Sequence, residues 1–161
     1  TYMEVIRGKT AMLFEASTHA AAALAGANEA QREALRTFGD HLGIAFQLVD
    51  DLLDYKGDAA ELGKNVGDDL AEGKPTLPLI YTMREGTEEQ AALVRRAIQK
   101  GGIEDLESIR AAVDAAGALD YTAQLARDYA ERAIACLDVL PAGEYRDALI
   151  ELSRFAVART H

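Results

Sequence analysis

The sequence is poor in the residues that mark several large classes of protein. Its 161 residues include one cysteine, three prolines and no tryptophan. A single cysteine excludes an intrachain disulfide and a cysteine-rich zinc site, and 49% hydrophobic residues exclude collagen and disordered chains. The sequence has no run of 18 apolar residues and no charged-then-apolar leader. We therefore expect a cytoplasmic protein without stable membrane insertion.

Positive charge is also scarce. The chain has 17 Lys and Arg residues against 27 Asp and Glu, which gives a formal net charge of −10. Without a basic patch, such a chain repels the phosphates of nucleic acids and anionic lipids, so we expect no nucleic-acid partner. An acidic ligand would need divalent cations or a few well-placed lysines.

Alanine, in contrast, is abundant. This abundance predicts an all-α fold, because alanine loses no side-chain entropy in a helix. The length is that of about one domain, and we expect a single all-α segment over residues 1–161. Helical spacing and cap residues predict helices over 3–25, 28–56, 87–100, 104–116, 122–140 and 144–159. Residues 57–78 are broken by glycine and proline, which predicts an irregular functional loop.

One face of the second predicted helix is acidic. Gln47, Asp50, Asp51, Asp54 and Asp58 fall within an arc of about 100°, and the opposite side is apolar. No Lys or Arg between residues 37 and 55 neutralises these carboxylates, and their spacing suits Mg²⁺. The alternatives are a solvated acidic face, which the apolar back disfavours, and a di-iron or di-manganese bundle, which lacks its Glu-x-x-His pairs here.

Basic residues occur on both sides of this acidic face in the sequence. Lys9 and Thr10 follow Arg7 at a helix irregularity caused by a glycine, and Lys64 and Lys74 lie among glycines that permit close backbone approach. Lysine binds phosphate as a point charge. Together with the acidic face, these residues outline a Mg²⁺-diphosphate site.

Three motifs occur in series. Residues 8–10 read Gly-Lys-Thr, residues 46–54 read Phe-Gln-x-x-Asp-Asp-x-x-Asp, and residues 63–78 read Gly-Lys-x-x-Gly-x-Asp-Leu-x-Glu-Gly-Lys-x-Thr-Leu-Pro. In this order, over essentially the whole chain, they resemble the C-terminal half of trans-polyprenyl diphosphate synthases. The resemblance implies a helical bundle, the C-terminal half of the isoprenoid synthase fold. It also implies a homodimeric prenyltransferase that condenses isopentenyl diphosphate with an allylic diphosphate.

The same resemblance implies a long product, of octaprenyl length, for the ubiquinone side chain, with shorter and longer products left open. It implies that Mg²⁺ is held by Asp50 as the principal ligand, with Asp51 and Asp54 binding through water or supporting the site. It implies contacts to the allylic diphosphate from Lys9, Thr10, Gln47, Lys64 and Lys74, and catalytic roles for Asp50, Lys9 and Lys64.

The family's first aspartate-rich motif and its isopentenyl diphosphate site are absent from these 161 residues. We therefore expect the chain alone not to elongate prenyl chains. We also expect it to self-associate, because helices that would pack against the other half of the fold expose apolar side chains. A noncatalytic helical subunit of a prenyl synthase is the alternative function.

Overall fold

The computed structural model describes residues 1–56, 67–101 and 104–158, and no strand occurs among them. The elements are α1 (Tyr2–Ile6), the π turn η1 (Arg7–Ala11), α2 (Met12–Leu24), α3 (Glu29–Lys56), α5 (Asp68–Ala71), α6 (Leu77–Glu85), α7 (Glu88–Lys100), α8 (Leu106–Ala115), α9 (Ala118–Cys136), the 3₁₀ turn η2 (Leu137–Val139) and α10 (Glu144–Ala158). The prediction of an all-α fold is confirmed.

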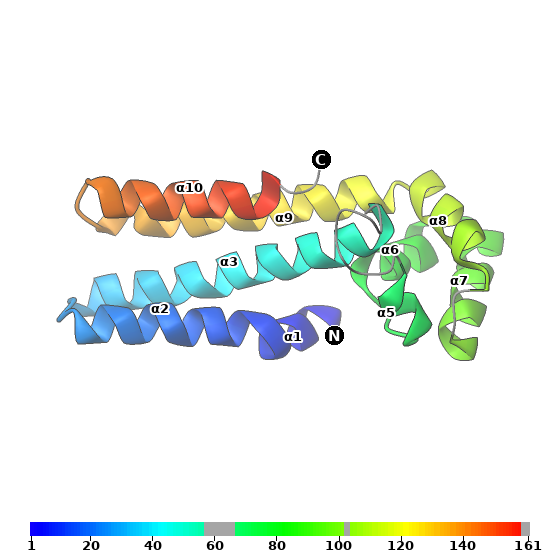
Figure 1. Ribbon diagram of the computed structural model, residues 1–161, viewed down its shortest axis with the longest axis horizontal. Coiled ribbons are helices and arrows are strands. Elements are labelled where there is room, and N and C mark those ends of the chain that lie inside the picture. Colours follow the sequence, from blue (N-terminus) through cyan, green and yellow to red (C-terminus); the bar gives the residue numbers. More distant parts are fainter. Residues whose placement is uncertain (57–66, 102–103, 159–161) are drawn as a thin grey trace.

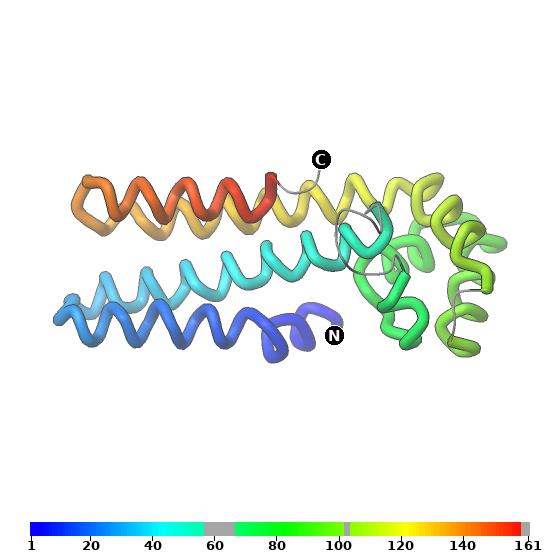
Figure 2. Tube along the Cα trace, in the orientation of Figure 1, coloured from blue at the N-terminus to red at the C-terminus, as the bar shows by residue number. Residues whose placement is uncertain are grey.

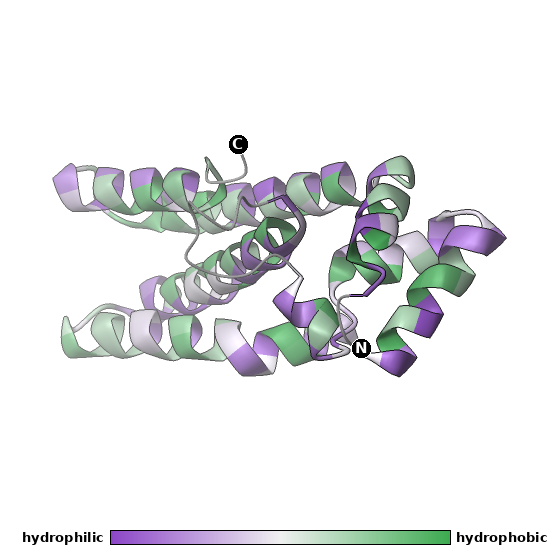
Figure 3. Cartoon of the chain, turned by 45° about the vertical axis from the view of Figure 1, so that its right-hand side comes forward, coloured by the Kyte–Doolittle hydropathy of each residue, from purple (hydrophilic) through white to green (hydrophobic). Residues whose placement is uncertain are grey.

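The long helices lie alongside one another, and the short helices α5 to α8 gather at one end of them (Figures 1 and 2). Helix α3 is central, because it packs against both α2 and α9, and α10 packs on α9. Hydrophobic residues occur along much of α2, including its outward side (Figure 3). None of the described helices is both long enough and apolar enough to cross a membrane.

The buried side of α3 contributes to three apolar clusters along its length. Phe38 and Leu42 pack with α9 and α10, and Ile44 and Leu48 pack with α1 and α9. Leu52 and Tyr55 then pack with the short helices. The helix that carries the acidic face is therefore anchored from behind along most of its length, as its apolar back predicts.

Glycines bring α2 and α3 into close contact. A Cβ atom at Gly39 would lie 2.6 Å from the Phe14 carbonyl oxygen, and one at Gly43 would lie 2.6 Å from the Ala11 Cα. Real Cβ atoms do not approach other atoms this closely, so α3 touches α2 through backbone at Gly39 and touches the π turn through backbone at Gly43. The Thr18 hydroxyl adds a cross-link by donating to the Leu35 carbonyl at 2.6 Å.

Two predicted helix starts are confirmed by their side-chain caps. The Gln31 N–H donates to Asn28 Oδ1 at 2.9 Å at the start of α3. The Thr87 side chain and Gln90 form a reciprocal capping box at the start of α7.

Three boundaries differ from the prediction. The helix expected over 122–140 runs from Ala118 to Cys136 and is followed by η2. The helix expected over 3–25 is interrupted by the π turn, and the stretch expected to be irregular up to residue 78 contains α5 and the start of α6. Pro78 lies in the first turn of α6, where a missing N–H costs nothing because that N–H has no partner within the helix. The prediction of an irregular stretch at this proline is therefore wrong.

Candidate functional site

The π turn determines how the beginning of the chain faces α3. The Met12 N–H donates to the Arg7 carbonyl, which places one extra residue in the turn. As a result Ile6 and Ala11, five residues apart, are both buried against the same helix. The helix irregularity predicted around Gly8 is therefore a π turn, a feature that often occurs at functional sites.

A chain of hydrogen bonds links this turn to the acidic face. The Thr10 hydroxyl donates to Gln47 Oε1 at 2.6 Å, and Gln47 Nε2 donates to Asp51 Oδ1 at 2.8 Å. The Tyr2 hydroxyl donates to the other oxygen of Asp51. Both oxygens of a carboxylate that is only 2% exposed are thus satisfied by neutral donors rather than by a cation.

Burial without a cation shifts the acid–base behaviour of this group. Burial raises the pKa of Asp51 to about 6, and the hydrogen bonds from Tyr2 and Gln47 act in the opposite direction. Burial and the neighbouring carboxylate raise the pKa of the Tyr2 hydroxyl, which keeps it protonated as a donor. The site therefore holds a carboxylate whose negative charge is destabilised and which would gain from a nearby positive charge.

Asp54, one turn further along α3, is in a similar position. Burial and the charge of Asp69 raise its pKa to about 6, against hydrogen bonds from the backbone of Asp69 and Asp68. Asp54 Oδ2 is buried and has no hydrogen-bond partner in the described part of the chain. The Gly67 N–H donates to the Asp54 carbonyl at 3.1 Å, so the segment that leads into α5 is attached to the end of α3.

A cavity of about 410 Å³ opens beside this network. It is lined by Tyr2, Val5, Ile6, Lys9, Gln47, Asp51, Lys74, Pro75 and Ile80. Lys74 is held by ion pairs to Glu72 at 2.5 Å and Asp69 at 3.4 Å, which fix the direction of its side chain. One cavity therefore combines two lysines, an amide and a carboxylate with an apolar wall.

The structure brings together four of the predicted site residues, Lys9, Gln47, Asp51 and Lys74, in this cavity. Thr10 is connected to it through Gln47. Asp50 and Asp54 lie on the same helix but are not among the residues that line the cavity. Lys64 lies outside the described residues.

Sequence reasoning missed Tyr2 and Asp69. Tyr2 contacts Asp51, which is 49 positions away in the sequence, and no local sequence pattern predicts such a contact. Asp69 could have been found, because an acidic residue five positions before a lysine in a glycine-rich segment can pair with it.

The carboxylate oxygens on this face of α3 are chemically suited to bind a hard cation. The acidic face offers carboxylate oxygens, the ligands that Mg²⁺ prefers, and the unpartnered Asp54 Oδ2 is available as a donor. Asp51, with both oxygens in hydrogen bonds, fits a supporting position. Across residues 1–56, 67–101 and 104–158, however, no three His, Cys, Asp or Glu side chains already converge as a metal site. The assignment of Asp50, Asp51 and Asp54 to a metal stays a prediction.

Comparison with known proteins assigns the chain to a family. The family model described as polyprenyl synthetase matches residues 1–116. Octaprenyl diphosphate synthase of Haemophilus influenzae is 50% identical over 161 residues, which are 99% of this chain and 49% of that protein. The all-trans-nonaprenyl-diphosphate synthase (geranyl-diphosphate specific) of Rhodobacter capsulatus is 52% identical over 158 residues, 98% of this chain and 48% of that protein.

Solved structures agree. A polyprenyl synthase from Caulobacter crescentus, crystallised with calcium and isoprenyl diphosphate, superposes with a TM-score of 0.92 at 46% identity, covering 99% of this chain and 49% of that one. The chain therefore spans about half the length of the relatives it matches and has the helical fold of their corresponding half. On this evidence the chain belongs to the polyprenyl synthetase family.

Proposed function

We propose that the chain provides the diphosphate-binding half of a trans-polyprenyl diphosphate synthase. In the proposed reaction the bond between the allylic carbon and the diphosphate oxygen breaks. The double bond of isopentenyl diphosphate then forms a new carbon–carbon bond to the allylic carbon, and a proton is lost. The departing diphosphate takes that proton, so no protein base is required, in keeping with the absence of histidine among the residues that line the described cavity.

The observation that carries this proposal is the shared cavity of Lys9 and Lys74. Two cationic side chains beside Gln47 suit a diphosphate, and the apolar side chains Val5 and Ile80 on the same wall suit the start of a prenyl chain. An amphiphile with one highly charged end matches this division. A purely polar metabolite would leave the apolar wall unused.

The lysines act where negative charge develops. As the carbon–oxygen bond breaks, charge accumulates on the diphosphate, and Lys9, Lys64 and Lys74 stabilise it. Thr10 and Gln47 orient the diphosphate through the hydrogen-bond chain that already joins them to Asp51. Because Thr10 and Gln47 are positioned before the substrate binds, they need little reorganisation at the moment of reaction.

We propose Mg²⁺ as the metal, held by Asp50 and assisted by Asp51 and Asp54. When bound, it supplies the positive charge that offsets the like charges of the diphosphate and of the acidic face. The calcium and isoprenyl diphosphate in the Caulobacter relative support a divalent cation together with a diphosphate. The raised pKa values of Asp51 and Asp54 support this assignment, because a nearby cation would stabilise both carboxylates in their ionised form.

The finer assignments are also proposals. Relatives named for octaprenyl and nonaprenyl products support a long chain, and we propose octaprenyl diphosphate for the quinone side chain. We further propose a cytoplasmic homo-oligomer in which the family's other half completes the cavity. Without that half, the 161 residues bind Mg²⁺-diphosphate weakly and do not elongate.

The test is incorporation of labelled isopentenyl diphosphate into farnesyl diphosphate with Mg²⁺. The chain is assayed alone and together with the upstream half of a related synthase, and a Lys9→Ala variant serves as control. We expect elongation only in the mixture, and strongly reduced elongation with the variant. A soluble complex without elongation would favour a noncatalytic helical subunit, and elongation by the chain alone would contradict the need for the other half.

A further inference from the structure

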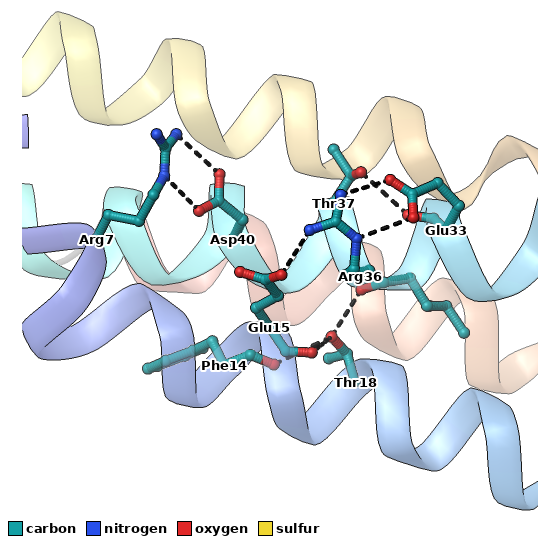
Figure 4. Close-up of polar contacts among 9 residues, drawn as sticks. Arg7, Phe14, Glu15, Thr18, Glu33, Arg36, Thr37 and Asp40 are labelled. Carbon is teal, nitrogen blue, oxygen red and sulfur yellow. Dashed lines mark hydrogen bonds and ion pairs between the residues drawn. The ribbon is translucent and has the colours of Figure 1, made fainter. Parts of the chain in front are cut away.

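An ion pair formed by the π turn, whose two residues do not line the cavity, concerns the placement of Lys9 and Thr10. Arg7 Nε and Nη2 donate to the two carboxylate oxygens of Asp40 on α3, at 2.8 Å and 3.1 Å (Figure 4). Arg7 is also the residue whose carbonyl accepts the hydrogen bond that closes the π turn. The same residue thus holds the turn through its backbone and attaches it to α3 through its side chain.

The anchor point on α3 belongs to the same helix face as the site. Asp40, Gly43, Gln47 and Asp51 recur every three or four residues, which places them on one stripe of α3. Gly43 receives the backbone of Ala11, the last residue of the π turn. The turn is therefore fixed to this stripe at Asp40 and Gly43, immediately before the positions that face the cavity.

The pair is more than a solvated surface contact. The Asp40 side chain is 15% exposed, whereas that of Arg7 is 50% exposed. A paired, two-bond contact to a mostly buried carboxylate has the geometry that gives an ion pair a fixed orientation, unlike most exposed pairs. Loss of Arg7 would leave the Asp40 carboxylate partly buried without this partner.

We propose that Arg7 is a positioning residue, which through Asp40 holds the π turn in register on α3 and so presents Lys9 and Thr10 to the diphosphate. The proposal adds a positioning residue to the proposed diphosphate site, and it therefore rests on the proposed function. Arg7 itself is not among the residues that line the cavity.

The chain offers a matched control one step further along the same two helices. Arg36 on α3 donates to Glu15 on α2 at 2.6 Å, so this pair also joins α2 to α3, but it lies beyond the π turn (Figure 4). A purely structural role predicts that Arg7→Ala and Arg36→Ala have the same effects. A positioning role predicts that only Arg7→Ala affects the turn and the ligand.

The test combines two measurements on the chain. Hydrogen–deuterium exchange reports the stability of the amides of residues 9–12, and calorimetric titration with farnesyl diphosphate and Mg²⁺, without isopentenyl diphosphate, reports binding. We expect Arg7→Ala to raise exchange in the turn about tenfold and to weaken binding about tenfold, and Arg36→Ala to change neither. The charge-swapped double variant Arg7→Asp with Asp40→Arg should restore most of both.

Each result bears on a separate claim. Unchanged exchange at residues 9–12 in Arg7→Ala, or equal changes in Arg36→Ala, would overturn the positioning role. A wild-type chain that binds no farnesyl diphosphate would instead count against the proposed function. The exchange comparison would still decide whether Arg7 holds the turn.

Discussion

The two halves of α3 differ in their packing contacts and in how their charged side chains are paired. In the half from Glu29 to Gly43, glycines let α2 approach to backbone contact, and Arg36 pairs with both Glu15 and Glu33 at 2.6 Å. In the half from Ile44 to Lys56, Asp51 is buried and lines the cavity, and Asp54 has a buried oxygen without a hydrogen-bond partner in the described part of the chain. The first half satisfies its charges with opposite charges, and the second satisfies Asp51 with neutral hydrogen-bond donors.

This difference has a cost in stability, which falls on the half of α3 that carries the acidic face. Raised pKa values at Asp51 and Asp54 mean that the fold is destabilised by their ionisation at neutral pH. Natural sequences break local rules of this kind mainly at functional sites. The carboxylate half of α3 should therefore respond to ligands and pH, whereas the glycine half should respond to packing changes.

The largest effect is expected from removing a cavity charge. In the synthase reconstituted with the upstream half, Lys9→Ala should lower the rate of elongation about 10² to 10³-fold, because it removes one stabilising charge at the leaving group. The melting temperature should stay close to that of the wild type, since Lys9 is exposed. Lys100→Ala, an exposed lysine paired with Glu104 outside the cavity, is the control and should leave the rate unchanged.

The next largest effect is expected in the glycine half. Gly43→Ala should lower the free energy of unfolding by about 1 to 3 kcal/mol, because the added methyl overlaps the Ala11 backbone. Gly8→Ala is the comparison, since nothing lies within 4 Å of a Cβ there and a helical glycine is intrinsically unfavourable. Urea unfolding measures both. Equal effects of the two substitutions would show that the helix contact is not as close as described.

A smaller effect is expected from pH. The folded pKa of Asp51, about 6, lies above its unfolded value of 3.8, so the folded chain binds more protons between these values and stability falls as pH rises through 6. Asp54, whose pKa is also raised to about 6, acts in the same direction as Asp51, and His41, whose pKa is lowered by burial, acts in the opposite direction. The wild-type profile contains all three contributions.

Asp51→Asn isolates the carboxylate. Between pH 5 and pH 7 the wild type should lose about 1 kcal/mol of stability relative to this variant. Chemical unfolding at a series of pH values without divalent cations gives the difference. A constant difference across this range would mean that Asp51 is ionised with an ordinary pKa.

The smallest effect on stability is expected on the outward side of α2, the helix that packs on the glycine half. Leu13 is 73% exposed and Leu24 is 90% exposed, and such apolar surface favours association. We predict a self-associating chain that Leu13→Lys shifts toward monomer in sedimentation experiments, with unfolding changed by about 0.5 kcal/mol or less. A wild-type chain that is monomeric at every concentration would contradict this prediction.

Periodic and local signals in the sequence predicted most of the fold. The apolar back of α3, the caps at Asn28 and Thr87 and the irregularity near Gly8 are all local features, and the structure contains them. Helix α6 is not predicted by these signals, because prolines at 75 and 78 are typical of loops, although proline is also favourable in a first helical turn.

The site was predictable only as far as its residues belong to local motifs. Lys9, Gln47, Asp51 and Lys74 were identified and do line one cavity. The partners that fix them were not, because Tyr2 reaches Asp51 and Arg7 reaches Asp40 only after α1 and the π turn have packed on α3. The depth at which each carboxylate is buried, and hence its raised pKa, also depends on this packing.

The most direct test of the central claim is thermal unfolding of the chain with millimolar Mg²⁺ and inorganic diphosphate, separately and together. If the carboxylate half of α3 and Lys9 form a Mg²⁺-diphosphate site, the two together should stabilise the wild type by about 1 kcal/mol or more, and each alone by much less. The stabilisation should disappear in Lys9→Ala and persist in Lys100→Ala. An unchanged melting temperature, or an equal shift in Lys9→Ala, would contradict the claim.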